Sequence, residues 1–382
     1  MKIGILTLPL KTNYGGILQA YALQYVLRRM GNDVSTFNIQ QREVPFYIKF
    51  LSLTKRLFLK FILKKKNVIL RGWISKRDLD IISKNLDEFI EKNINLTDKI
   101  KITRGSKQNI NNYFDVYIVG SDQVWRPKMV INLEFYYLNF IYELKKVKRV
   151  AYAVSFGVDN KEYSKKKINK CFPLIQKFNS ISVRENSGIN LCQEYFSKTP
   201  IQVLDPTMLL KKEDYLNLIP NKKNTKERNN EIFAYILDDS EFTNNVVKII
   251  ANNLKKKVVN ILPNEIKLRN NTTNNFDLRL PSIESWIEYF NMSDFIITDS
   301  FHGTVFSILF NKPFVTISNY NRGKSRLSSL LKIFKLENRL INSISDLNTI
   351  ADYKSIDFEN VNRIMEIERN KSISFLKNSL IL

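Results

Sequence analysis

The sequence predicts two α/β domains, each built around a parallel sheet with helices on both faces. Short apolar runs that are typical of buried strands alternate with segments of helical periodicity through most of the 382 residues. A polar, charged segment at 219–230 interrupts this alternation, which then starts again. A chain of this length can form two cores of ordinary size. We therefore expect a Rossmann-like domain over 1–218, a linker over 219–230, a second such domain over 231–344 and helices over 345–382, with a cleft between the domains.

The first half contains the elements of a doubly wound sheet. A strand over 2–8 is followed by the pair Gly15 and Gly16, a helix over 17–30 and a second strand over 33–39. Apolar residues recur at helical spacing in this helix, and the three elements make a βαβ unit of the usual length. Further strands are expected over 114–119, 149–154, 181–183 and 201–204, with a helix before the last of them that ends near residue 196.

The second half repeats this alternation of strands and helices. Strands are expected over 231–237, 257–262, 295–297 and 313–317, and helices over 241–254, 282–292, 305–309 and 325–336. One or two helices fill 345–380. Asn311-Lys312-Pro313 forms a stop signal between the helix over 305–309 and the strand that follows it.

The composition limits the classes of partner and the compartment. The formal net charge of +23 favours anionic partners, namely nucleic acid, phosphorylated substrates or an acidic lipid surface, and the alternative is a lysine-rich solvated surface. Cys171 and Cys192 form no CxxC pattern, and with a single histidine they exclude a Cys/His zinc site. We expect no metal, no cofactor, and a reducing, cytoplasmic location. No run of about 18 apolar residues predicts a transmembrane helix, and the apolar start is interpreted as a strand rather than a signal peptide.

A basic helical insertion is expected at about 45–95. Its segment 49–66 carries seven basic residues and no acid, interleaved with Leu, Phe and Ile, which is typical of a basic amphipathic helix. Such a helix either makes peripheral contact with the anionic surface at the inner face of the membrane, or packs its apolar side on the domain. A second helix is expected over 71–93. Basic residues and stacking aromatics do not interleave on one sheet, so nucleic-acid binding is not expected.

One stretch of the second half, residues 294–314, joins a buried strand, a turn and a helix. Asp299 and Ser300 follow the strand, and either side chain suits a helix cap. His302, the single histidine, lies where the carboxyl end of the strand meets the amino end of the helix. Ligands of open α/β sheets bind at such ends, and free helix N–H groups favour an anion. His302 is therefore a candidate for proton transfer; the alternative is a helix-start residue bonded to its neighbours.

Two strand ends in the first half carry similar candidates. Asp122 follows Gly120-Ser121 at the end of a strand, with the large aromatic Trp125 in the same loop, and we expect Trp125 to be exposed there. Asp122 either orients a sugar hydroxyl or acts as a base, and otherwise it caps a turn. Arg184 lies at another strand end, where a guanidinium can grip a carboxylate or phosphate. Its alternative role is a salt bridge with adjacent acids.

Six short motifs identify a family when they are taken in order. They are Asn13-Tyr14-Gly15-Gly16 with Gln19-Ala20-Tyr21-Ala22-Leu23, Val119-Gly120-Ser121-Asp122-Gln123-Val124-Trp125, Ser155-Phe156-Gly157, Ser182-Val183-Arg184-Glu185, Asp205-Pro206-Thr207 and Thr298-Asp299-Ser300-Phe301-His302-Gly303. Over roughly residues 1–340 the chain thus resembles the polysaccharide pyruvyl transferase family. The resemblance implies a fold similar to two-domain GT-B glycosyltransferases.

The implied activity is transfer of the enolpyruvyl carbons of phosphoenolpyruvate onto a sugar, usually as a cyclic ketal across two hydroxyls, with release of phosphate. The acceptor is a sugar of a cell-surface polysaccharide or its lipid-linked precursor. His302 matches the family's histidine and is the expected catalytic acid/base, together with Asp122. The expected substrate-binding residues are Asn13, Tyr14, Gly15, Gly16, Gln19, Ser121, Trp125, Arg184, Asp299, Ser300, Phe301, Gly303, Arg322 and Arg326.

The sequence departs from the family pattern immediately before the histidine. Many relatives carry Arg-Leu there, whereas this chain has Ser300-Phe301. Arg322 or Arg326, in the next loop and helix, are the candidates to supply the missing cation. The alternative is another donor, which makes the protein a GT-B-like glycosyltransferase that uses a nucleotide sugar.

Overall fold

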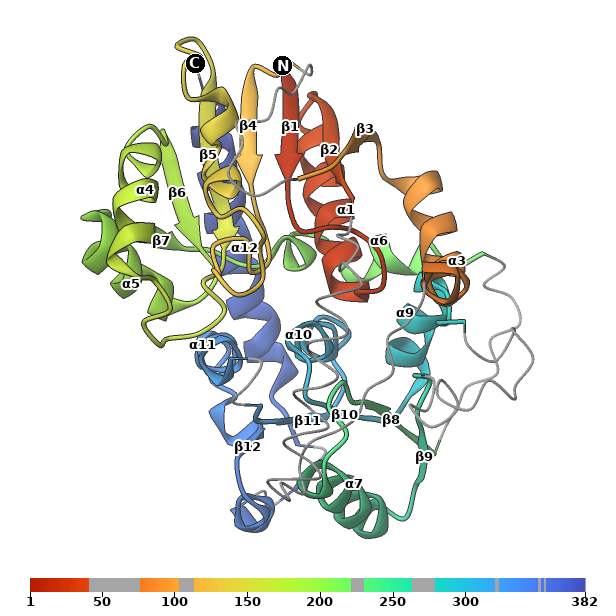
Figure 1. The fold of residues 1–382 in the computed structure, drawn as a ribbon. Coiled ribbons are helices and arrows are strands. Elements are labelled where there is room, and N and C mark those ends of the chain that lie inside the picture. Colours follow the sequence, from red (N-terminus) through yellow and green to blue (C-terminus); the bar gives the residue numbers. More distant parts are fainter. Residues whose placement is uncertain are drawn as a thin grey trace, which may run out of the picture.

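The computed structural model contains two α/β domains, each with one parallel sheet, and this arrangement confirms the predicted fold class (Figure 1). It describes residues 1–40, 76–102, 113–220, 230–262, 279–319, 323–349, 352–353 and 355–381. The amino-terminal domain, with both chain termini, occupies the upper part of Figure 1, and the carboxyl-terminal domain lies below it.

The sheet of the amino-terminal domain has its first strand near the centre. Its strands are β1 (Lys2–Leu6), β2 (Asp33–Ile39), β3 (Leu96–Ile100), β4 (Val116–Val119), β5 (Lys148–Val154), β6 (Ser180–Val183) and β7 (Ile201–Gln202). Their order is β3-β2-β1-β4-β5-β6-β7, and all pairings in the described ranges are parallel. Ile5 of β1 pairs with Thr36 on one side and Ile118 on the other. Because both faces are covered, the central strands are apolar throughout.

Helices and short 3-10 turns surround this sheet. They are α1 (Tyr14–Arg29), α3 (Lys76–Asn93), η2 (Glu134–Tyr137), η3 (Asn139–Ile141), α4 (Lys165–Ile175), α5 (Asn186–Phe196), η4 (Pro206–Leu209) and α6 (Lys212–Leu216). Helix α1 begins at Tyr14 rather than at the predicted residue 17. Asn13 is extended at the cap position, so Gly15 and Gly16 belong to the first turn of the helix. The glycine pair is therefore helical and does not form a loop.

The sheet of the carboxyl-terminal domain is smaller. Its strands are β8 (Glu231–Tyr235), β9 (Lys257–Val259), β10 (Phe295–Thr298), β11 (Phe314–Ile317) and β12 (Leu340–Ile341), in the order β12-β11-β10-β8-β9. The helices are α7 (Glu241–Leu254), α9 (Ile283–Met292), α10 (Phe301–Leu309), α11 (Lys324–Ile333), η7 (Glu337–Arg339), η8 (Ile344–Thr349) and α12 (Phe358–Leu380). The central strand β10 is fully buried and ends just before Ser300 and His302.

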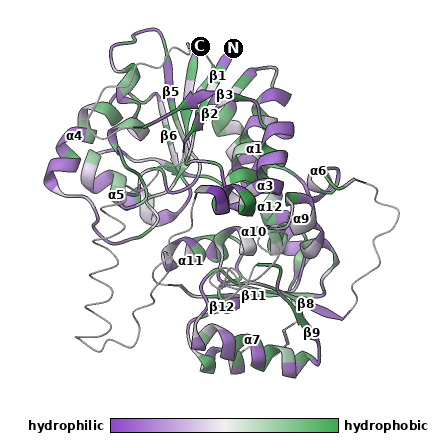
Figure 2. Ribbon diagram, turned by 45° about the vertical axis from the view of Figure 1, so that its right-hand side comes forward, coloured by the Kyte–Doolittle hydropathy of each residue, from purple (hydrophilic) through white to green (hydrophobic). Residues whose placement is uncertain are grey.

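Helix α7 illustrates how the outer helices form. Ser240 caps it by accepting a hydrogen bond from the Thr243 backbone N–H at 3.1 Å. Val246 and Ile250 are buried four residues apart on one face. Figure 2 accordingly shows both hydrophobic and hydrophilic residues along this helix.

Helix α12 returns from the carboxyl-terminal domain to the amino-terminal one (Figure 1). The Arg369 guanidinium donates to the carbonyl oxygens of Met208 at 2.9 Å and Leu210 at 3.2 Å. The Phe375 ring packs 6.1 Å from Tyr152 of β5. The last helix therefore belongs structurally to the first domain, which the chain order alone does not indicate.

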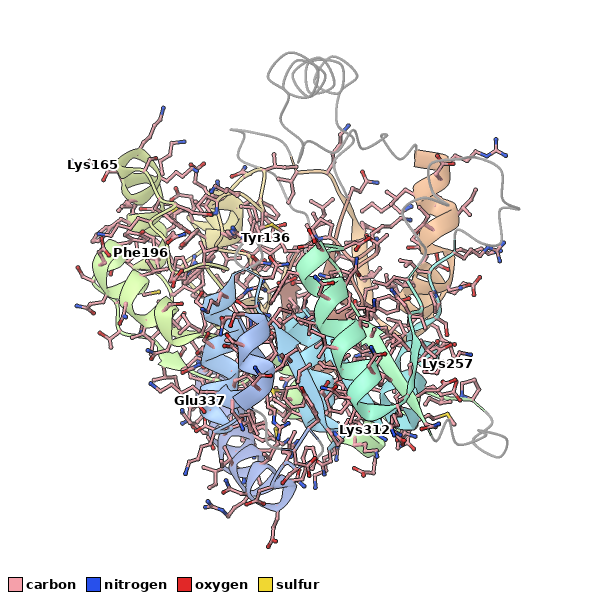
Figure 3. The ribbon with its side chains drawn as sticks, turned by 90° about the horizontal axis from the view of Figure 1, so that it is seen from below. Tyr136, Lys165, Phe196, Lys257, Lys312 and Glu337 are labelled. Atoms are coloured by element: carbon pink, nitrogen blue, oxygen red, sulfur yellow. The ribbon has the colours of Figure 1, made fainter. Side chains whose placement is uncertain are left out.

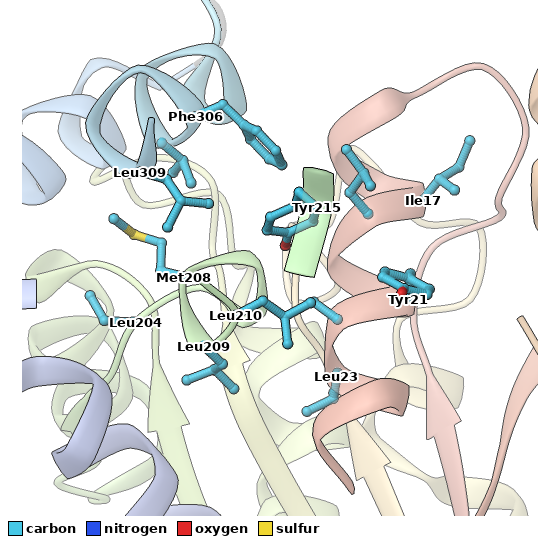
Figure 4. Close-up of a cluster of buried hydrophobic side chains, with 14 of the residues drawn as sticks. Ile17, Tyr21, Leu23, Leu204, Met208, Leu209, Leu210, Tyr215, Phe306 and Leu309 are labelled. Atoms are coloured by element: carbon cyan, nitrogen blue, oxygen red, sulfur yellow. The ribbon is translucent and has the colours of Figure 1, made fainter. Parts of the chain in front are cut away.

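The two domains share one hydrophobic core. Figure 4 shows Phe306 and Leu309 of α10 beside Met208 and Tyr215 of the amino-terminal domain. The rings of Tyr215 and Phe306 lie 4.9 Å apart at 62°. A core that crosses the domain boundary restrains the relative position of the domains, because opening them exposes apolar surface.

Some sequence predictions fall on parts of the chain that are not described. These are the basic helix over 49–66 with its membrane contact, and most of the linker over 219–230. In the described ranges, no helix has the length and apolarity needed to cross a membrane. Lysines such as Lys165 are exposed and lie at the periphery in Figure 3, which agrees with the alternative of a solvated, lysine-rich surface.

Candidate active site

A cavity of about 290 Å³ lies where the carboxyl ends of the two sheets meet. The amino-terminal domain contributes Thr12, Asn13, Asp122 and Gln123 to its lining. The carboxyl-terminal domain contributes Tyr235, Leu237, Asp299, Ser300, Phe301, His302, Arg326 and Leu327. The lining of this one cavity thus brings together the predicted site residues Asn13, Asp122, Asp299, Ser300, Phe301, His302 and Arg326.

The turn before α10 is fixed by short polar side chains. Ser300 is the N-cap, and its Oγ accepts from the Gly303 backbone N–H at 3.3 Å. The Ser300 backbone N–H in turn donates to Thr298 Oγ1 at 3.1 Å. A Cβ at Gly303 would overlap Thr298, so only glycine lets the helix pack this close to β10. These contacts place His302 in the first turn of α10, facing the other domain.

His302 is held between two groups of the amino-terminal domain. Its side chain is 9% exposed, and Nε2 lies 3.7 Å from Asp205 Oδ2. The opposite side of the ring, with Nδ1, lies against Gly15 in the first turn of α1, where a Cβ would overlap the imidazole. Nε2 is buried and has no hydrogen-bond partner. The imidazole is therefore part of the domain interface as well as of the cavity lining.

Asp205, which follows β7, is fully buried and joins several of the sequence motifs. Its Oδ1 accepts from the Thr207 backbone N–H at 3.1 Å and hydroxyl at 2.7 Å. Its Oδ2 accepts from Arg184 Nη1 at 2.9 Å and from Ser121 Oγ at 3.1 Å. Burial by itself raises the pKa of this carboxyl, but His302, Arg184 and Thr207 together hold the pKa well below its ordinary value.

Arg184 occupies the centre of a buried acidic group. Besides Asp205, its guanidinium lies 3.7 Å from Asp122 and 3.8 Å from Glu185, and its side chain is 1% exposed. Burial lowers the pKa of Arg184, but the three carboxylates raise it more, and the net pKa is above its ordinary value. Arg184 is not part of the cavity lining. The salt bridges that were the alternative role of Arg184 are thus present, and its predicted grip on a substrate anion stays a prediction.

Arg326 reaches the cavity from the first turn of α11. The ring of Phe301 lies between the two arginines, 4.2 Å from the Arg184 guanidinium and 5.9 Å from that of Arg326. Burial, followed by the charge of Arg184, lowers the pKa of Arg326 to about 10. Lys324 and Arg326 also lie at the positive end of the α11 dipole, which favours anions. Arg322 lies outside the described residues.

Glu185 closes the loop that follows β5. Its Oε1 accepts from the Ser155 hydroxyl at 2.8 Å and from the backbone N–H groups of Phe156 at 2.9 Å and Gly157 at 3.3 Å. The Ser155-Phe156-Gly157 motif is therefore an anion-binding turn that a carboxylate of the protein itself occupies. The contribution of Glu185 to the site is to hold this loop in place through these hydrogen bonds.

The predicted exposure of Trp125 is wrong, and Tyr14, another predicted substrate-binding aromatic, is buried as well. Trp125 is fully buried, with its ring 4.7 Å from Tyr137 in a stacked arrangement and its Nε1 donating to the Tyr136 carbonyl at 3.1 Å. Tyr14 is 1% exposed and stacks on Trp286 of the other domain at 5.4 Å. Large aromatics gain more from burial than from a place in a wet loop, and here they support the loops from behind.

Two predicted polar residues, Gln19 and Asp299, hold the backbone around the cavity. Gln19 donates to Thr7 Oγ1 and accepts from the Ser121 backbone N–H, both at 2.9 Å, so it ties α1 to the loop before Asp122. Asp299 accepts from the backbone N–H groups of Leu237 at 2.7 Å and Asp238 at 2.9 Å. These bonds explain why the motifs contain residues of these types. Besides Asp299, the acidic and basic side chains that line the cavity are Asp122, His302 and Arg326.

Asp205 and Glu185 belong to the six sequence motifs, but no role was predicted for either residue. The position of Asp205 in the sequence could have indicated a place near the site. Asp205 follows a strand, and the carboxyl ends of parallel strands meet at one edge of a sheet. Within the described ranges, no group of three or more His, Cys, Asp or Glu side chains is arranged to hold a metal ion.

Solved structures with similar backbones cover nearly the whole chain at low identity. The UDP-GlcNAc 2-epimerase of Methanocaldococcus jannaschii, in complex with UDP-GlcNAc and UDP, has 13% identity and a TM-score of 0.45 over 96% of this chain and 99% of that one. The UDP-GlcNAc 2-epimerase of Neisseria meningitidis, bound to UDP-GlcNAc, has 12% identity and a TM-score of 0.47 over 100% and 95%. Arabidopsis thaliana UGT89C1, complexed with UDP-L-rhamnose, has 8% identity and a TM-score of 0.49 over 100% and 99%.

Sequence comparison gives a more specific result. Among curated proteins, no sequence matches this chain significantly. A family profile described as polysaccharide pyruvyl transferase matches residues 13–321, a range that begins at the N-cap of α1 and includes β11. The matched range includes Asp122, Asp205 and His302, and it spans both domains. The chain therefore belongs to the polysaccharide pyruvyl transferase family.

Proposed function

We propose that this protein transfers the enolpyruvyl carbons of phosphoenolpyruvate to a sugar of a cell-surface polysaccharide or of its lipid-linked precursor, forming a ketal. The family supports a transferase of this class, and the observation that carries the proposal is the content of the cavity. His302, Asp122 and Arg326 line it from three different elements. They provide an acid/base group, a carboxylate and a cation, which are the three kinds of group that the reaction requires.

The reaction balances with these groups alone. The oxygen of a sugar hydroxyl bonds to C2 of phosphoenolpyruvate while C3, the methylene carbon, takes up a proton. The C2–O bond to phosphate then breaks, and a second sugar hydroxyl bonds to C2 to complete the ketal. Of the two hydroxyl protons released, one balances the proton delivered to C3 and the other leaves with phosphate. The protein must therefore give one proton and accept others at defined positions.

His302 is the proposed proton donor to C3. Imidazole changes its protonation state in the physiological range, so one residue can give a proton and later recover it. Asp122, across the cavity on the other domain, is the proposed acceptor for the proton of the attacking hydroxyl. Its Oδ1 already accepts from the Gln123 backbone N–H at 2.8 Å, which fixes the orientation of the carboxylate.

Arg326 is the proposed ligand for the phosphate or carboxylate of the donor. It is 8% exposed and lines the cavity, and burial, followed by the charge of Arg184, lowers its pKa, so a bound anion would offset the repulsion between the two arginines. The amino ends of α1 and α11, which have no side-chain cap, also lie at the cavity with that of α10, and the positive ends of helix dipoles favour an anion. Ser300 in place of the arginine of many relatives is compatible with donor binding if Arg326 supplies the charge.

The decisive test is incubation of the purified protein with phosphoenolpyruvate and lipid-linked or nucleotide-activated sugars. We expect phosphate release that depends on the acceptor, together with a product whose mass corresponds to a pyruvyl ketal. Folded protein that releases no phosphate with any acceptor would argue against the proposal. A thermal-shift screen separates it from the glycosyltransferase alternative: stabilisation by UDP or GDP sugars, and none by phosphoenolpyruvate, would favour nucleotide-sugar transfer.

A further inference from the structure

We propose that Asp205 is a positioning residue for His302, which holds the imidazole with its proton on Nε2 and thereby presents Nδ1 to the donor. The inference rests on the proposed role of His302 and deepens it. Asp205 lies outside the cavity lining and belongs to the other domain, so it would act through the histidine and not on the substrate. Carboxylate–imidazole pairs fix tautomer and ring orientation in this way in other enzyme classes.

Nε2 of His302 is buried and has no hydrogen-bond partner, and an unpaired polar atom in such a place is unfavourable. Asp205 Oδ2, at 3.7 Å, is the acceptor that faces it. Catalytic hydrogen bonds are often long before substrate binds and shorten in the complex. A small movement of the imidazole would bring Nε2–H into hydrogen-bond contact with this carboxylate.

The Asp205 carboxylate that faces Nε2 has a fixed orientation and charge. Asp205 is fixed by hydrogen bonds from Thr207, Ser121 and Arg184, so its two oxygens cannot rotate away from the imidazole. The same contacts keep it ionised, because they favour the charged form in spite of complete burial. A fixed carboxylate accepts hydrogen bonds and donates none, so it selects the tautomer with the proton on Nε2.

The opposite nitrogen, Nδ1, lies against Gly15, and His302 shares the cavity lining with Thr12 and Asn13. With Nε2 directed at Asp205, Nδ1 is the nitrogen that remains for proton transfer. Asp205 and His302 come from different domains, so the pair forms only where the two domains meet.

The single histidine allows a direct test in the wild-type protein. Protein produced with ¹⁵N-labelled histidine, and with no histidine tag, gives signals from one imidazole. Nitrogen chemical shifts distinguish a protonated from a bare ring nitrogen. For the neutral ring we expect a protonated Nε2 and a bare Nδ1, and the opposite tautomer or an equal mixture would overturn the proposal. This readout requires no turnover, so it stands or falls independently of the proposed reaction.

The second test uses Asp205→Asn with Thr207→Val as the matched control. The asparagine variant should lose about 10²–10⁴-fold in kcat with little change in KM for phosphoenolpyruvate, because the donor does not touch residue 205. Its imidazole should also lose the single-tautomer signature. Thr207→Val removes the hydroxyl bond to the same carboxylate but keeps the backbone N–H bond, so it should keep the tautomer and most of kcat. Equal kcat losses in both variants with the tautomer unchanged would show a structural role only. If Asp205→Asn does not fold, the wild-type spectrum still decides.

Discussion

Gly15 lies directly against the imidazole of His302, although the two residues come from opposite domains. Gly15 belongs to the first turn of α1, and a Cβ there would overlap Nδ1, Cγ and Cε1 of the ring. The backbone at Gly15 is helical and does not require glycine by its φ angle. The glycine is therefore needed for the close approach of the histidine, and this contact connects the first sequence motif to the last.

Gly15→Ala should impair the enzyme more than it impairs folding. The added methyl group must push His302 or the whole of α10 aside, and a displacement of about 1 Å at a catalytic group can cost about 10²-fold in rate. Gly16→Ala is the matched control, because its Cβ would meet the Asn13 side chain, at 3.0 Å, and not the imidazole. Steady-state rates and thermal unfolding of both variants check this. A fully active Gly15→Ala protein would refute the close contact.

His302→Ala should abolish pyruvyl transfer with little loss of stability. The side chain lies at an interface rather than in the apolar core, and it makes no hydrogen bond through Nε2. Phosphate release measures the activity, and chemical denaturation measures the free energy of unfolding. A mutant that retains full activity would remove His302 from the mechanism.

Arg326→Gln should raise KM for phosphoenolpyruvate by about 10–100-fold, since a hydrogen bond to a charged group contributes roughly 1.5–3 kcal/mol. Lys324→Gln is the control, because it removes a charge from the same helical turn but not from the cavity lining. Initial rates at varied donor concentration give KM for both variants. Equal effects of the two substitutions would indicate a general electrostatic effect rather than direct binding.

Trp286→Ala should destabilise the whole protein by about 3–5 kcal/mol. Trp286 is fully buried, stacks on Tyr14 of the other domain and contacts Phe306 at 4.7 Å. Because this core is shared, the two domains should unfold in one transition, which urea denaturation followed by circular dichroism can show. Tyr113→Ala, at a side chain that is 70% exposed, should change stability by less than about 0.5 kcal/mol. Two separate transitions in the wild type would contradict a shared core.

The pH dependence of stability should reveal Asp205. Burial raises the pKa of Asp205, but His302 and Arg184 lower it by more than burial raises it. The folded-state pKa therefore lies below the unfolded value of about 3.9. A depressed carboxyl pKa stabilises the fold above the unfolded pKa, and this contribution is lost as the pH falls. The stability difference between wild type and Asp205→Asn should therefore shrink below about pH 4. Urea titrations between about pH 3 and pH 7 measure it, and a constant difference would contradict the prediction.

Strands and helices with a strong apolar period were predictable from the sequence. Strand β2 (Asp33–Ile39) and helix α7 (Glu241–Leu254) have the predicted bounds, because their patterns are continuous and end at turn residues. The edge strand β3 (Leu96–Ile100) was not predicted. It is only partly buried and contains Asp98 and Lys99, so local pattern does not mark it, and its pairing with β2 forms it.

The site was predictable in its parts but not in its connections. His302 and Asp122 follow strands, and the rule that ligands bind at such ends places both on the cavity. Tyr14 and Trp125 belong to the same motifs, but they turn toward the core, since each has a large ring partner there. A motif records which residues lie near a site, and it does not record which way each side chain points.

The sequence by itself determined the two α/β domains, the family and the place of His302 at a helix start, because these depend on local period and short motifs. Only the tertiary structure decided which groups face that histidine. Asp205 and Gly15 approach it from the other domain, and Arg184 is neutralised by acids from three segments. The physical reason is that burial and pairing of charges depend on distances across the fold, and residues far apart in the chain set those distances.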